Sequence, residues 1–65
     1  MKKYEYVNSL GLNKCLIVND ERPDKKGRYP VELWCLDTGE LCGLDRLDHD
    51  ALAEFLANYE IAIDF

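Results

Sequence analysis

The pattern of apolar and polar residues in the first part of the chain predicts four short β-strands. Residues 4–7 (YEYV) partly alternate, and residues 15–18 (CLIV) form the compact apolar run that is typical of a buried strand. A third strand is predicted at 31–36 (VELWCL) and a fourth at 41–44 (LCGL). Gly39 lies between these two and suits the left-handed position of a tight turn with a β-bulge. Together the runs predict an antiparallel meander of three or four strands.

The rest of the chain predicts one α-helix and a closing strand. Four apolar residues recur at helical spacing and predict a buried stripe: Leu52, Phe55, Leu56 and Tyr59. Asp48 is a suitable N-cap and Asn58 is suited to end the helix in a left-handed conformation, so we expect the helix at about 48–58. Apolar residues then alternate with period two, which predicts a C-terminal β-strand at about 60–65.

The expected fold class is therefore α+β, a small antiparallel β-meander with one helix and a C-terminal strand. A chain of 65 residues has room for a single domain, spanning 1–65. The polar stretch at about 19–30 (NDERPDKKGRYP) contains two prolines and a glycine, and it predicts a mobile loop.

The third strand is apolar on both sides. Val31, Leu33 and Cys35 point one way, whereas Trp34 and Leu36 point the other way. One helix can cover only one face of the sheet, and an uncovered face is normally polar. We therefore expect Trp34 and Leu36 to form an interface with a protein partner or with a second copy in a homodimer. The alternatives are that the long loop folds back over this face, or that the sheet curves tightly.

Charge is unevenly distributed along the chain. The net charge is −5, and 48% of the residues are apolar, enough to build a core. Residues 1–36 hold seven Lys or Arg and five Asp or Glu, a net of +2, whereas residues 37–65 hold one base and eight acids, a net of −7. Such asymmetry marks either an interaction surface or an ordinary solvated surface.

Membrane insertion and secretion are not expected. No segment approaches the roughly 20 apolar residues that cross a bilayer, and the N-terminus lacks the apolar stretch of a signal peptide. The three cysteines show no framework spacing, so we expect reduced thiols and a cytoplasmic protein.

Two short motifs could suggest catalysis, and each has a structural explanation. Residues 37–39 (DTG) spell the aspartic-protease triplet, but that chemistry needs two aspartates in a cleft, and here the triplet lies between two apolar runs as a turn would. Asp48, His49 and Asp50 are adjacent residues of a helix start, so they do not share one face. We expect no catalytic residues and no enzyme.

Four potential zinc ligands are present, namely Cys15, Cys35, Cys42 and His49. None of them is paired at the short spacing that lets one turn present two thiolates, so we expect no metal and no cofactor. Cys35 and Cys42 flank the predicted turn, and a disulfide between them would fit only the hairpin register that places them opposite each other.

The only basic cluster lies in the long loop, where Lys25, Lys26 and Arg28 could contact phosphates and Tyr29 could stack on a base. The acidic second half opposes this, because it would repel a nucleic-acid backbone. The reverse hypothesis is an acidic mimic of nucleic acid, built from several carboxylates: Asp37, Glu40, Asp45, Asp48, Asp50 and Glu54.

The sequence favours a small non-enzymatic protein–protein interaction module. It would use an apolar sheet face for association and an acidic helix edge for specificity. A nucleic-acid-associated protein using the 25–28 loop, or an acidic nucleic-acid mimic or inhibitor, is the alternative. No small-molecule substrate is evident.

Overall fold

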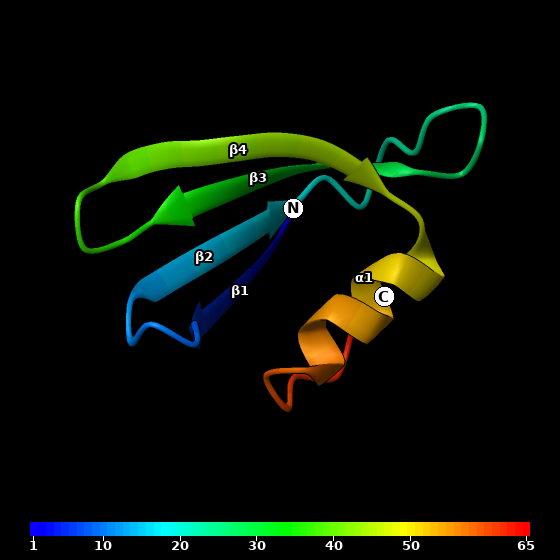
Figure 1. Ribbon diagram of the computed structural model, residues 1–65. Helices are drawn as coiled ribbons and strands as arrows, with labels where there is room; N and C mark the ends of the chain where they lie inside the picture. The colour runs from blue at the N-terminus through cyan, green and yellow to red at the C-terminus, as the bar shows by residue number, and fades with distance from the viewer.

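A computed structural model describes all 65 residues, and it shows a four-stranded antiparallel sheet with one helix (Figure 1). The elements are β1 (Lys2–Val7), β2 (Asn13–Val18), β3 (Tyr29–Cys35), β4 (Glu40–Leu47) and α1 (His49–Ala57). The strands lie in the order β1-β2-β3-β4, so each pairs with its neighbour in the sequence. This confirms the predicted meander and the α+β class. The helix is too short and too polar to cross a lipid bilayer.

The loop between β2 and β3 is shorter than predicted. Tyr29 and Pro30 belong to β3, and the carbonyl of Pro30 accepts a hydrogen bond from the backbone N–H of Asn19 at 3.0 Å. The rest of the loop turns around Asp24, whose carboxylate accepts hydrogen bonds from the backbone N–H groups of Lys26 and Arg28, each at 2.9 Å. Asp24 thus organises the tip of the loop as an Asx turn does.

The core lies between the helix and one face of the sheet. Seven residues form its buried centre: Tyr4, Tyr6, Leu16, Val18, Val31, Leu52 and Leu56. Leu52 and Leu56 are fully buried, and Phe55 and Tyr59 pack beside them, so the predicted helical stripe is confirmed. The ring of Tyr6 meets those of Phe55 and Tyr59 with centroids 5.6 and 4.2 Å apart.

The two ends of the helix are capped differently. The Asp48 carboxylate accepts a hydrogen bond from the backbone N–H of Ala51 at 2.7 Å, which confirms Asp48 as the N-cap. Asn58 keeps a right-handed conformation with φ −61°, so its predicted left-handed role is wrong. The left-handed residue is Glu60, with φ 60°.

Glu60 closes the helix in a Schellman motif. Its N–H donates to the carbonyl of Ala57, and the N–H of Ile61 donates to the carbonyl of Leu56, both at 3.0 Å. The motif reverses the direction of the chain, so that the last residues run back toward His49 at the start of α1.

The predicted C-terminal strand at about 60–65 is wrong, because residues 61–65 pair with no strand. The alternation itself has a different cause. Ile61, Ile63 and Phe65 pack against the core, whereas the residues between them are exposed. The ring of Phe65 meets that of Tyr29 edge-on at 5.2 Å, and the carbonyl of Phe65 lies 2.6 Å from Nε2 of His49. The segment is an extended tail that packs through its side chains and makes no strand pairing.

Candidate interaction surface

The face of the sheet opposite α1 is not covered by the chain, and we call it the outer face. Figure 1 shows that the loop between β2 and β3 extends beyond the end of the sheet instead of folding over this face. The predicted alternative of a covering loop is therefore wrong. The strand register places alternate residues of each strand here: Lys3, Glu5 and Val7; Asn13, Cys15 and Ile17; Pro30, Glu32 and Trp34; and Leu41, Leu44 and Arg46.

The predicted orientation of β3 is confirmed. Val31 and Leu33 pack in the core and Cys35 is buried on the same side, whereas Trp34 points to the outer face. Leu36 follows the end of β3 and is 46% exposed, and its backbone N–H bonds to the carbonyl of Asn13.

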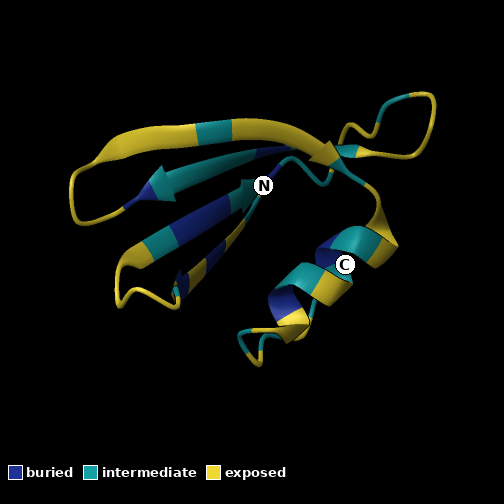
Figure 2. Ribbon diagram, viewed as in Figure 1, coloured by how far each residue is buried: buried dark blue, intermediate teal, exposed yellow.

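A β-bulge brings two leucines of β4 onto the outer face. Residues three apart in a regular strand point to opposite faces. Between Leu33 and Trp34 the register shifts, so that Leu41 lies opposite Trp34 and Leu44 opposite Glu32, with Cys42 as the extra residue. Leu41 and Leu44 are 45% and 71% exposed, and Figure 2 shows that nearly all of β4 is exposed.

The indole of Trp34 is held in place within the outer face. Its Nε1–H donates a hydrogen bond to Oε1 of Glu32 at 2.9 Å. Cys15 lies directly opposite Trp34 and is buried, and desolvation raises the pKa of its thiol. Because the one polar group of the indole is already satisfied, the apolar ring can meet a partner without leaving a buried donor unpaired.

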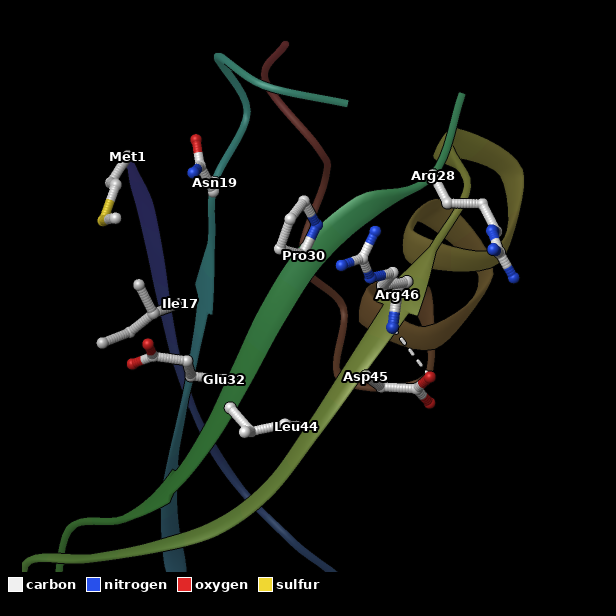
Figure 3. A pocket seen from close by; sticks show the side chains of 9 residues that line it. All are labelled: Met1, Ile17, Asn19, Arg28, Pro30, Glu32, Leu44, Asp45 and Arg46. Carbon is white, nitrogen blue, oxygen red and sulfur yellow. Dashed lines mark hydrogen bonds between the residues drawn. The ribbon is translucent and has the colours of Figure 1, made fainter. Parts of the chain in front are cut away.

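One end of the outer face is hollowed (Figure 3). The apolar side chains of Ile17, Pro30 and Leu44 line this hollow together with the charged side chains of Glu32 and Arg46. Small-molecule sites usually enclose most of their ligand. This hollow is open to solvent, so it would enclose only part of such a ligand.

The charges of the outer face are balanced in sign. Lys3 and Arg46 are positive, and Glu5 and Glu32 are negative. The excess of acidic residues therefore lies elsewhere on the molecule, and two such faces could approach without strong repulsion.

The basic loop is partly neutralised. Lys25 and Lys26 are exposed, but Nε of Arg28 bonds to Oδ2 of Asp24 at 3.1 Å. Hydrogen bonds from the Arg28 and Lys26 backbone, together with the Arg28 guanidinium, lower the pKa of Asp24. Tyr29, considered above for stacking on a base, packs against the C-terminal tail. The structure thus leaves two free cations at this site and no available aromatic ring.

The DTG triplet forms the turn between β3 and β4. The carboxylate of Asp37 accepts hydrogen bonds from the backbone N–H and from Nδ2 of Asn13, both at 3.0 Å, and these bonds lower its pKa. Gly39 has φ 73°, as predicted for the turn. Asp37 therefore ties the turn to β2.

The candidate zinc ligands do not come together. Cys15 lies on the outer face, Cys35 lies on the inner face beside the β3–β4 turn, and His49 bonds to the C-terminal tail. No three His, Cys, Asp or Glu side chains are close enough to share a metal ion. Cys35 pairs with Glu40, so the register that would place it opposite Cys42 is not formed, and all three cysteines are free.

No protein-family model matches this chain, and no curated protein or solved structure shows significant similarity to it.

Proposed function

We propose that this protein is a small non-enzymatic protein–protein interaction module whose contact surface is the outer face. The observation that carries the proposal is the uncovered apolar centre of that face. Trp34, Ile17, Leu41 and Leu44 share it, and none of them is fully buried. Contiguous apolar surface on a small protein marks a site of association when the chain itself leaves it open.

The composition of the outer face supports this proposal. Trp is among the residues that most often anchor a protein interface. Interfaces also have an apolar centre with a polar rim. Here Trp34 and Ile17 lie on the two central strands, together with Glu32, whose carboxylate accepts the hydrogen bond from the indole of Trp34. Lys3, Glu5 and Arg46 lie on the edge strands.

The acidic helix edge lies on the other layer of the fold. Asp50 and Glu54 are exposed on α1, and Asp48 caps its start. In the proposed function these charges keep the helix side strongly hydrated and repel acidic partners. Association is thereby confined to the outer face.

The proposal places the protein in the cytoplasm. Cys42 is an exposed free thiol, and Cys15 and Cys35 are free as well. Free thiols of this kind persist in a reducing compartment.

The experiment compares variants of single exposed residues. Trp34→Ala removes the central anchor, and Leu10→Ala is the matched control, because Leu10 is 80% exposed in the turn between β1 and β2. Far-ultraviolet circular dichroism checks that both variants fold. Association is then measured by sedimentation equilibrium for the protein alone, and by quantitative capture from a native lysate for other partners.

We expect Trp34→Ala to weaken association by about 2 kcal/mol or more and Leu10→Ala to leave it unchanged. A folded Trp34→Ala variant that retains the same self-association and the same captured proteins as the wild type would overturn the proposal. So would a wild-type protein that neither self-associates nor retains a partner.

A further inference from the structure

The exposed strand β4 has the properties of a self-pairing edge. Resting on the proposed function, we propose that β4 pairs antiparallel with β4 of a second copy, about a two-fold axis at Leu44. The pairing would join two four-stranded sheets into one continuous sheet. It would also place the two outer faces side by side on the same surface of the dimer.

The hydrogen-bonding pattern shows which residues of β4 face the open edge. The bonds Leu36 N–H to Asn13 O and Asn19 N–H to Pro30 O mark the hydrogen-bonded pairs between β2 and β3. Because these pairs alternate along an antiparallel ladder, even-numbered residues of β3 bond to β2 and odd-numbered ones bond to β4.

The same alternation then applies to β4. Val31 pairs with Asp45 and Leu33 with Gly43, so these residues of β4 direct their backbone groups toward β3. Leu44 therefore directs its N–H and C=O toward the open edge of the sheet, with its side chain on the outer face. A second strand could bond to these groups without disturbing any bond within the chain.

Leu44 is the position of β4 at which a two-fold axis matches an apolar residue with its own copy. A two-fold axis at this position sets Leu44 opposite the partner's Leu44, and the two would exchange both of their free backbone hydrogen bonds. Their side chains, 71% exposed in the single chain, would bury each other on the outer face. Shifting the axis by one residue would instead set Asp45 opposite the partner's Asp45, and like charges directly opposite are destabilising.

The other edge of the sheet is less suited to such pairing. By the same alternation, Lys3 and Glu5 direct their backbone groups to the open edge of β1. Both of these residues are charged, whereas the corresponding positions of β4 hold Leu44 and Arg46. Charged side chains at such positions are the usual protection of natural sheets against edge pairing. β1 is also shorter than β4, with 6 residues against 8.

The charge distribution permits two copies to meet at β4. The outer face is balanced in sign, as described above. The acidic residues Asp50 and Glu54 lie on the helix, in the layer on the inner side of the sheet. Within β4 the acids Glu40 and Asp45 are partly offset by Arg46, so pairing along β4 brings together less negative charge than contact through α1 would.

Cross-linking tests the position of the axis. Residues in a hydrogen-bonded antiparallel pair have Cα atoms about 5.5 Å apart, within the roughly 4.4–6.8 Å range that a disulfide spans. Leu44→Cys, in a Cys42→Ser background, should form a disulfide-linked dimer with oxidised glutathione, which accepts the two electrons released as the bond forms. Leu10→Cys in the same background is the control and should stay largely unlinked.

A proline substitution tests the backbone bonds. Proline is tolerated on an edge strand where its missing N–H would face solvent, so Leu44→Pro should fold. It should weaken the dimer at least about tenfold relative to Leu44→Ala, because the dimer loses two main-chain bonds. Sedimentation equilibrium gives the dissociation constants, and circular dichroism verifies folding.

The outcomes separate this inference from the proposed function. A dimer that Trp34→Ala weakens but Leu44→Pro does not, with no cross-link at position 44, overturns edge pairing and leaves the outer face as the interface. If the chain is strictly monomeric and captures proteins from the lysate through Trp34, edge pairing is likewise overturned and the outer face remains the interface. Cross-linking at position 44 with a proline-sensitive dimer supports the inference, even where Trp34→Ala has no effect.

Discussion

At the scale of single residues, one hydrogen bond joins the two ends of the chain. The hydroxyl of Tyr4 donates to Oδ1 of Asp64 at 2.5 Å, and Nζ of Lys2 lies 3.6 Å from Oδ2 of the same carboxylate. Burial and the hydrogen bond to Asp64 together raise the pKa of Tyr4 to about 12. The same bond lowers the pKa of Asp64. The contact therefore needs a neutral tyrosine and an ionised aspartate.

This pair should make stability depend on pH at both ends of the scale. The Asp64 contribution is present above the unfolded pKa of about 3.9 and is lost as pH falls through the lower folded value. The Tyr4 contribution is present below the unfolded pKa of about 10 and is lost as pH rises toward the folded value of about 12. Tyr4→Phe should flatten both limbs of the stability profile.

Urea denaturation between about pH 2 and pH 11 measures this profile. Tyr59→Phe is the control, because it removes a hydroxyl from a ring that packs in the same core. Identical profiles for the wild type and Tyr4→Phe would contradict the assigned role of the contact.

At the scale of elements, the sequence predicted the strands and the helix because each carries its own periodicity. Residues 61–65 show that periodicity alone does not predict a strand. Ile61, Ile63 and Phe65 alternate and do bury one side of an extended segment, as expected. Period two reports which side chains are buried, whereas a strand also requires a neighbour for its backbone. The Schellman turn at Glu60 directs the tail back toward the start of α1, where it does not pair with a strand of the sheet.

The outer face was predictable in part. The alternation within β3 is enough to orient Trp34 and Leu36 away from Val31. Leu44 could not be placed in the same way, because Leu41 and Leu44 would point to opposite faces of a regular strand. Only the bulge at Cys42 brings both to one face, and Gly43 beside it is the one residue of the LCGL run that can mark a bulge. The alternation in β3 that orients Trp34 also places Glu32 on this surface, whereas Arg46 joins it through the pairing of β4 with β3, which the sequence does not specify.

The left-handed conformation of Glu60 gives a prediction for the helix end. A non-glycine residue at φ 60° carries strain of about 1–3 kcal/mol. Glycine removes the strain but adds about 0.4–1 kcal/mol of entropy to the unfolded chain. Glu60→Gly should therefore stabilise the protein by about 1 kcal/mol.

Thermal or urea denaturation measures the effect of Glu60→Gly. Glu54→Gly is the contrasting control, because it places glycine within α1 and should destabilise the fold by about 1 kcal/mol. A loss of stability in Glu60→Gly would show that the strain at Glu60 is smaller than the entropy that glycine adds to the unfolded chain.

Packing of α1 gives a second prediction at this scale. Leu52 is fully buried, so Leu52→Ala should cost about 2–5 kcal/mol through lost contacts and the cavity left behind. Leu44→Ala makes the same chemical change at an exposed position and should stay within about 0.5 kcal/mol of the wild type. Urea denaturation at low protein concentration compares the stability of the two variants. Equal unfolding midpoints would contradict the position of the helix on the sheet.

At the scale of the whole molecule, the salt dependence of binding distinguishes a protein-interaction module from a nucleic-acid-binding protein. A nucleic-acid site using Lys25, Lys26 and Arg28 would contact about three phosphates, so its affinity would fall roughly 500-fold for a tenfold rise in salt. Association through the apolar outer face should change only a few-fold over the same range. Fluorescence titration with a labelled oligonucleotide, beside sedimentation of the protein alone, measures both. Tight, steeply salt-dependent oligonucleotide binding that Lys25→Gln abolishes would favour the nucleic-acid alternative.

The meander also has a consequence for the order of folding events. Every strand bonds to the strand that precedes or follows it in the sequence, and such local topologies fold fast because each closure is short. The Tyr4–Asp64 bond instead spans 60 positions, so it should form after the rate-limiting barrier. Asp64→Asn should then accelerate unfolding and leave the refolding rate almost unchanged in a stopped-flow chevron. Slower refolding of Asp64→Asn would place the tail in the folding nucleus. In that case the Tyr4–Asp64 bond would not set the unfolding rate, and so would not set the lifetime of the native state.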